Sequence, residues 1–151
     1  SRKHIIAGVK ASVERLGTYI DVLQIHRLDH DTPMEEIMRA LNDVVTQGDA
    51  RYIGASSMLA TEFAELQFIA EKHDWFKFVS SQSCYNLLYR EDERELFPFA
   101  RRHNIALIPW SPLARGALAR PLGANTQRGT TDKGFERFGF AILESLEQEI
   151  I

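Results

Sequence analysis

The chain has 151 residues, of which 44% are apolar and 26% are charged, and its formal net charge is −3. These values are typical of a globular domain with a sizeable core, and they give no electrostatic reason to expect a nucleic-acid or membrane partner. No apolar run approaches the ~20 residues that cross a bilayer. The single cysteine, Cys84, excludes an internal disulfide and is typical of a reducing compartment, so we expect a cytoplasmic protein.

The first third of the chain predicts two helices around a buried strand. Ser1 and Gly17 bracket a helical apolar pattern, and Gly17 suits the left-handed position after a helix. Residues 19–25 are a near-continuous apolar run, which is typical of a strand buried on both faces. Thr32–Glu35 then matches a capping box with proline at the first helical position, and Gly48 ends that helix.

The same alternation continues along the chain. Further strands are expected over 51–56, 78–82 and 105–110, with a helix capped by Ser57 or Thr61 after the first of them and a helix over Glu91–His103 that ends at Asn104. The strands start about 30 residues apart, which leaves room for one right-handed crossover helix between parallel neighbours.

The alternation of apolar strands and helices stops after Trp110. Residues 114–140 carry five glycines and little periodicity, and a loop of that length is unusual unless it is functional. Residues 141–151 predict one more helix, which stops in the middle of its pattern. The chain also opens on a helix with no strand before it. We therefore expect a single α/β domain over residues 1–151 that is truncated at both ends.

Two architectures fit four strands that alternate with helices. One is a small doubly wound sheet, and the other is the middle of a (β/α)8 barrel of ~250 residues. A Rossmann domain is not supported, because no GxGxxG follows any expected strand and no Walker-type phosphate loop is present.

Polar or aromatic residues follow the end of each expected strand. They are His26 after the first strand, Ser56 and Ser57 at the end of the second, Gln82 at the end of the third, and Trp110 followed by a Gly-containing turn with Arg115 after the fourth. In a parallel barrel these ends share one rim. An aromatic ring, hydroxyl and amide groups, and a basic turn together suit a flat amide-bearing ring with a phosphate tail, such as nicotinamide. Each residue alone could equally cap a helix, satisfy backbone or fill the core.

Four longer stretches carry a resemblance to a known family. They are SVERLGTYIDVLQIHRLDHDTPMEEIMRAL, GDARYIGASS, SQSCYNLLYREDERELFPFARRHNIALIPWSPLARG and RGTTDKGFERF. In this order and spacing they resemble the aldo-keto reductases, specifically the branch with aryl-alcohol dehydrogenase-like enzymes and potassium-channel β subunits. The resemblance implies a partial (β/α)8 TIM barrel of about four βα units, strands four to seven of the family barrel. It also implies NADPH as cofactor and a small-molecule carbonyl substrate.

The resemblance assigns roles residue by residue. His26 matches the active-site histidine that orients and polarises the substrate carbonyl, and Trp110 matches the aromatic that stacks on nicotinamide. The positions that match cofactor contacts are Ser56 and Gln82 for the carboxamide, Ser111, Pro112, Leu113, Ala114 and Arg115 for the pyrophosphate, and Arg128 near the adenosine phosphate. Ser57 stands beside Ser56 where many relatives have asparagine, so a hydrogen-bonding side chain is kept there.

The family's catalytic Tyr, Lys and Asp match no residue of this chain. All four tyrosines lie in segments that match other parts of the family, so none can be assigned the acid's role. The resemblance therefore implies a reductase fragment without its own activity. The alternatives are a non-catalytic NADPH-binding regulatory subunit and an inactive truncated gene product. His26 favours the enzyme, because the channel-type relatives lack histidine at its position.

Overall fold

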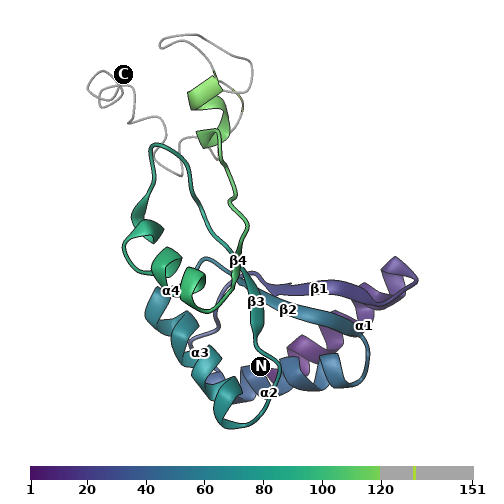
Figure 1. The fold of residues 1–151 in the computed structure, drawn as a ribbon. Helices are drawn as coiled ribbons and strands as arrows, with labels where there is room; N and C mark the ends of the chain where they lie inside the picture. The colour runs from purple at the N-terminus through teal and green to yellow at the C-terminus, as the bar shows by residue number, and fades with distance from the viewer. Residues whose placement is uncertain (120–130, 132–151) are drawn as a thin grey trace. The chain divides into compact units, whose positions relative to one another are not determined.

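We describe a computed structural model of the chain, which covers residues 1–119 and 131 (Figure 1). The residues group into two compact units, and each is described by itself. The first unit contains Ser1–Ser83 and Glu91–Pro109, and the second contains Cys84–Arg90 and the residues from Trp110 onward. In the part of the chain that is described, no helix is long and apolar enough to cross a bilayer.

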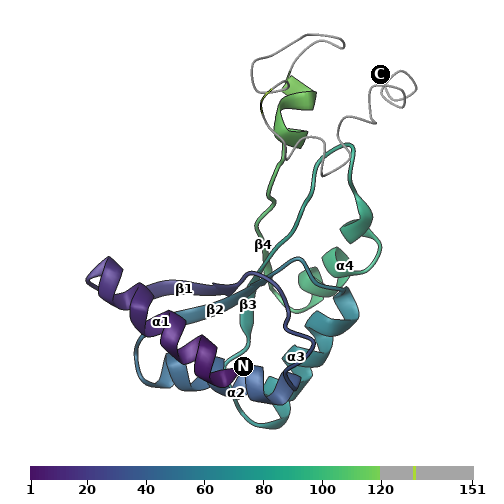
Figure 2. The same cartoon turned by 180° about the vertical axis from the view of Figure 1, so that it is seen from behind.

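The first unit is built on a four-stranded parallel sheet in the order β1-β2-β3-β4. Its strands are β1 (Ile20–Ile25), β2 (Ala50–Ser56), β3 (Phe78–Gln82) and β4 (Ala106–Leu107), and its helices are α1 (Arg2–Leu16), α2 (Met34–Thr46), α3 (Ala60–Lys72) and α4 (Leu96–Arg102). Helices α1, α2 and α3 line the same side of the sheet (Figure 2). The predicted alternation of helices and parallel strands is confirmed.

The core lies between the sheet and these helices. Phe63 of α3 and Phe78 of β3 are almost fully buried, with ring centroids 5.5 Å apart. Gln67 is also buried, and its side chain bonds both backbone groups of Phe78: Nε2 donates to the carbonyl at 3.0 Å, and the amide N–H donates to Oε1 at 2.8 Å. Ile53 and Ala55 of β2 complete the sheet side of this core.

Strand β4 is shorter than the sequence predicted. Only Ala106 and Leu107 pair with β3, and one further bond runs from the Ile108 N–H to the Ser81 carbonyl at 2.9 Å. Strand β4 thus ends at Leu107, three residues before its predicted end at residue 110, and Pro109, which has no N–H to donate, lies in that interval.

The predicted end of α1 is confirmed, whereas the predicted start of α2 is not. Gly17 has φ +69° and its N–H bonds the Val13 carbonyl, as predicted. The capping box at Thr32 is wrong, because Pro33 is the cap residue and the Thr32 hydroxyl donates to Asp29 Oδ2 at 2.6 Å instead. In a capping box the hydroxyl oxygen would accept a helix N–H, and no such side-chain bond is present at the start of α2.

Neither expected cap of α3 is used. The cap residue is Leu59, whose N–H donates to Glu62 Oε2 at 2.9 Å. Ser57 has φ +44° and belongs to the turn that leaves β2, too early in the chain to cap α3.

The expected helix over 91–103 is divided. A short 3-10 turn, Glu91–Glu93, precedes α4, because Glu95 has non-helical angles of φ −134° and ψ −52°. The left-handed end at Asn104 is confirmed, with φ +55°.

The second unit contains a bridge between Cys84 and Trp110 and a 3-10 segment, Ala114–Ala119, interrupted by left-handed residues. Its buried apolar core is Ala114, packed by partly buried neighbours such as Leu88 and Leu118. The predicted helix over 141–151 lies outside the described residues.

Candidate functional site

The carboxyl ends of the first three strands lie next to one another. Ile25 pairs with Ala55 across β1 and β2, and Ser56 pairs with Gln82 across β2 and β3. His26 follows directly after β1. The parallel register thus brings the predicted residues at the ends of β2 and β3 into direct contact.

Ser56 is buried and its hydroxyl direction is defined. Oγ donates to the Gln82 backbone carbonyl at 2.7 Å. The same carbonyl accepts the Ser57 N–H at 3.0 Å, and the Ser57 hydroxyl lies 3.4 Å from Ser56 Oγ. Because the Ser56 proton is committed to Gln82, its oxygen can only accept from a further group.

The Gln82 side chain is oriented by Gln24, which the sequence reasoning missed. Gln24 Nε2 donates to Gln82 Oε1 at 3.5 Å, so the Gln82 NH2 group lies on the opposite side of the amide. Gln24 shares this face of the sheet with Gly54 and Ser80, since a Cβ at Gly54 would meet Ser80 Oγ at 2.4 Å and Gln24 Cγ at 3.1 Å. Alternate residues of a strand point to the same face, so the position of Gln24 two residues before His26 could have indicated that it shares the face of His26.

His26 is exposed at the end of the edge strand β1. Its backbone carbonyl accepts from the Arg27 guanidinium at 2.7 Å. His26 also contributes to the lining of a groove of about 510 Å³ between α1 and β1, with Ile5 and Val9 on the helix and Leu23 on the strand.

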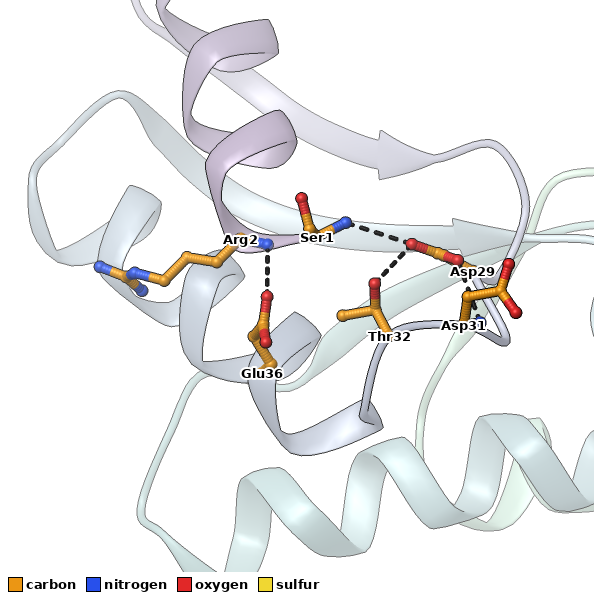
Figure 3. Close-up of polar contacts among 6 residues, drawn as sticks. All are labelled: Ser1, Arg2, Asp29, Asp31, Thr32 and Glu36. Atoms are coloured by element: carbon orange, nitrogen blue, oxygen red, sulfur yellow. Dashed lines mark hydrogen bonds and ion pairs between the residues drawn. The ribbon is translucent and has the colours of Figure 1, made fainter.

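A polar loop follows β1 and is fixed by Asp29 (Figure 3). The Asp29 carboxylate accepts the Thr32 hydroxyl at 2.6 Å, the Asp31 N–H at 3.1 Å and the Ser1 ammonium at 3.1 Å. The Thr32 hydroxyl, followed by the Ser1 ammonium and the Asp31 N–H, lowers the pKa of Asp29 from its usual value. These bonds use the carboxylate to hold the loop, which is a structural role.

The second unit holds the other predicted cofactor residues in one continuous segment. Ser111 O accepts the Ala114 N–H at 2.9 Å, which closes a turn through Pro112 and Leu113. Positive φ angles occur at Ser111 (53°), Ala114 (46°) and Arg115 (56°). With Ser57, these are four of the six non-glycine residues with positive φ in the described part of the chain, and such strain concentrates at functional sites.

Loop 84–90 anchors this segment. Tyr85 N–H donates to the Trp110 carbonyl at 3.4 Å, and Asn86 Nδ2 donates to the Ser111 carbonyl at 3.0 Å. Asn86 is not among the site residues predicted from the sequence. Arg128, the remaining predicted contact, lies outside the described residues. Among the residues that are described, no cluster of three or more His, Cys, Asp or Glu side chains could hold a metal ion.

The chain is similar to proteins of one family. Residues 1–138 match the model of the Aldo/keto reductase family. The chain is 70% identical over 151 residues to "Putative aryl-alcohol dehydrogenase AAD16" of Saccharomyces cerevisiae, covering all of this chain and 44% of that protein. It is 64% identical over 135 residues to "Versiconal hemiacetal acetate reductase" of Aspergillus parasiticus, covering 89% of this chain and 39% of that protein.

A solved structure supports the same assignment. The "putative 2,5-diketo-D-gluconic acid reductase B" superimposes with a TM-score of 0.70 at 30% identity, and the match covers 80% of this chain and 42% of that one. The chain thus spans less than half the length of the relatives it matches, and its parallel α/β sheet is part of a (β/α)8 barrel. By sequence and by fold, the chain belongs to the aldo/keto reductase family.

Proposed function

We propose that these 151 residues are the central part of an NADPH-dependent reductase that converts aldehydes or ketones to alcohols. Membership of the aldo/keto reductase family supports the class of reaction. The choice of NADPH, the residue roles and the activity of the whole barrel are our proposals, and they follow from the chemistry of the candidate site.

The observation that carries the proposal is the Ser56–Gln82 pair. Ser56 Oγ donates to the Gln82 carbonyl and so offers an acceptor, while Gln82 Oε1 accepts from Gln24 and so leaves the NH2 group as a donor. A primary carboxamide carries the complementary set, one NH2 donor and one carbonyl acceptor. The pair therefore fits the carboxamide of nicotinamide.

The second unit offers the groups expected for the rest of the cofactor. Trp110 is half-buried and presents an indole suited to stacking on a flat ring. The turn from Ser111 to Arg115 combines strained backbone with a guanidinium, a combination that suits phosphate oxygens. Arg128 is proposed to lie near the adenosine phosphate.

NADPH would supply a hydride to the substrate carbonyl carbon. The proposed role of His26 is to donate a hydrogen bond to the carbonyl oxygen and hold it in place as charge develops. A matching tyrosine acid is absent from this chain, so we expect no turnover from the 151 residues alone. The free edge of β1 and the groove beside α1 are where the remainder of the barrel would pack.

The test uses a hybrid barrel, in which this chain replaces the matching segment of the AAD16 relative. Trp110→Ala should weaken NADPH binding by about 1–3 kcal/mol through lost stacking and burial. His26→Ala should leave NADPH affinity unchanged and lower kcat and kcat/KM together by roughly 10²-fold. NADPH fluorescence titration and steady-state kinetics on aromatic aldehydes, normalised to folded protein, measure both effects.

Trp75→Ala is the matched control, because Trp75 is the second tryptophan and stacks on His73 with centroids 4.4 Å apart. It should lower stability and leave NADPH affinity per folded molecule unchanged. An unaltered kcat after His26→Ala would remove His26 from the active site, and a hybrid that binds NADPH without turnover would support a binding module over an enzyme. A hybrid that does not bind NADPH would refute the proposed function.

A further inference from the structure

The turn proposed to bind phosphate is strained and has little apolar support. Ser111, Ala114 and Arg115 all have positive φ, which is costly for residues with a Cβ. The apolar cluster around the turn has Ala114 as its one fully buried member among the described residues. A conformation of this kind persists only when its surroundings hold it from several directions.

Asn86 supplies that support through every polar atom of its side chain. Oδ1 accepts the N–H of Leu88 at 2.9 Å and of Tyr89 at 3.0 Å. Nδ2 donates to the Ser111 carbonyl at 3.0 Å and approaches Cys84 Sγ at 3.8 Å. Asn86 is only 5% exposed, so these bonds are shielded from water and costly to lose.

The oxygen and the nitrogen of the Asn86 side-chain amide bind different segments. The Oδ1 bonds close the short turn from Asn86 to Tyr89, which is also paired through the backbone in both directions at 3.2 Å. The Nδ2 bond reaches the Ser111 carbonyl, which already accepts the Ala114 N–H at 2.9 Å. The Ser111 carbonyl, from which the cofactor turn starts, thus accepts two hydrogen bonds, one from Asn86 and one from the Ala114 N–H.

We propose that Asn86 is a positioning residue for the cofactor-binding turn Trp110–Arg115, and that it sets the affinity for the dinucleotide by holding the Ser111 backbone. This inference rests on the proposed function, since it names the residue that shapes one of the proposed binding elements. Asn86 touches neither cofactor nor substrate in this role and acts through the turn.

Asn86→Asp is the discriminating substitution. It keeps an oxygen to accept the Leu88 and Tyr89 N–H groups, but it removes the donor to Ser111 and places a carboxylate oxygen against that carbonyl. Gln67→Glu is the matched control, because Gln67 is also a buried amide that clamps backbone, at Phe78 of the first unit. Both variants exchange one amide for one acid.

Two measurements report how the substitutions affect the turn and cofactor binding. Mass-resolved limited trypsin digestion reports cleavage after Arg115, in the 151-residue chain and in the hybrid barrel. NADPH titration and kinetics with the hybrid report the dissociation constant and kcat. Asn86→Asp should speed cleavage at Arg115 and raise the NADPH dissociation constant about 10-fold or more, with kcat at saturating NADPH changed much less. Gln67→Glu should lower stability and change neither quantity per folded molecule.

The outcomes separate the two proposals. Equal cleavage and equal NADPH affinity in the Asn86→Asp and unsubstituted hybrids would overturn the role of Asn86. Equal losses in Asn86→Asp and Gln67→Glu would also overturn it, because the effect would then be general destabilisation. If the unsubstituted hybrid binds no NADPH, the proposed function fails and the role of Asn86 in affinity falls with it, while the cleavage rates still report whether Asn86 holds the turn.

Discussion

The two compact units are held together by different kinds of interaction. In the first unit, thirteen buried apolar residues form one cluster between the sheet and its helices. In the described part of the second unit, the corresponding cluster has one buried residue, Ala114, and the chain is fixed mainly by Asn86 and backbone hydrogen bonds. Apolar packing tolerates no gap but is not directional, whereas a hydrogen-bonded turn can place individual backbone groups accurately.

This difference predicts which substitutions should change stability and which should change cofactor binding. Stability is expected to depend on the core of the first unit, because burial of large apolar side chains dominates the free energy of folding. We expect a few polar contacts, such as the Ser56–Gln82 and Asn86–Ser111 pairs, to determine how accurately the proposed binding groups are positioned. Removing a polar contact should change binding more than it changes the unfolding midpoint.

The largest effect on stability should come from Phe63→Ala. Phe63 is fully buried, and its ring lies 5.5 Å from that of Phe78 and 6.2 Å from that of Phe99. The substitution leaves a cavity and should lower the free energy of unfolding by about 3–5 kcal/mol. Urea denaturation of the hybrid barrel measures it. Phe76→Ala is the control, since that ring is 50% exposed, and similar losses in both variants would contradict a single dominant core.

A smaller effect is expected from Gly54→Ala on the opposite face of the sheet. The new methyl group would meet Ser80 Oγ at 2.4 Å and the Ser80 carbonyl at 3.3 Å. Overpacking of this kind should cost about 1–3 kcal/mol. In the double variant with Ser80→Ala most of that loss should be recovered, because the hydroxyl is the closest atom and has no hydrogen-bond partner among the described residues.

The measurement is a double-mutant cycle by urea denaturation. Ser80→Ala alone should be close to neutral, because it removes a buried hydroxyl without breaking a bond. If the Gly54→Ala loss is the same with and without Ser80, the two positions do not interact, and the close approach of β2 and β3 is not what requires glycine.

The sequence predicted those features that depend on local pattern. Helix α2 lies within one or two residues of its predicted ends, because Ile37, Leu41 and Val44 recur at helical spacing and face the core. The parallel arrangement of the strands followed from their spacing, since each interval leaves room for one crossover helix, although two architectures fitted it. His26, Ser56 and Gln82 were predicted from their positions after strands, and the structure places them at the carboxyl ends of β1, β2 and β3.

The features that were missed depend on particular side-chain contacts, most of them distant in the sequence. Thr32 does not cap α2; its hydroxyl donates to Asp29 in the preceding loop, a local contact that residue preferences do not include. Gln24 contacts Gln82 from 58 positions away, and Asn86 contacts Ser111 from 25 positions away. Neither residue type indicates its partner until the register of the chain is known, so these positioning contacts could only come from the structure.

The smallest expected effect concerns a surface contact of the first unit. Glu62 accepts from the Leu59 N–H at 2.9 Å and lies 2.8 Å from His30 Nε2. The His30 hydrogen bond, and after it the Leu59 N–H, lowers the pKa of Glu62 below its ordinary value of 4.5. The folded state therefore binds fewer protons than the unfolded state between that value and the lowered one, so stability falls as the pH decreases through this range.

Glu62→Gln should abolish this pH dependence, because glutamine does not titrate. Above pH 4.5 the contribution of Glu62 is fully present, and the substitution should cost less than about 1 kcal/mol, because His30 is 71% exposed and solvent screens the pair. As the pH falls below 4.5, the unfolding curves of the two proteins should converge. Glu65→Gln, on the same helix, removes one charge without altering the His30 or Leu59 contacts. A loss of stability well above about 1 kcal/mol, or a loss independent of pH, would contradict this expectation. Polar surface contacts would then contribute substantially to the stability of the first unit, and the contrast with the second unit would be weaker.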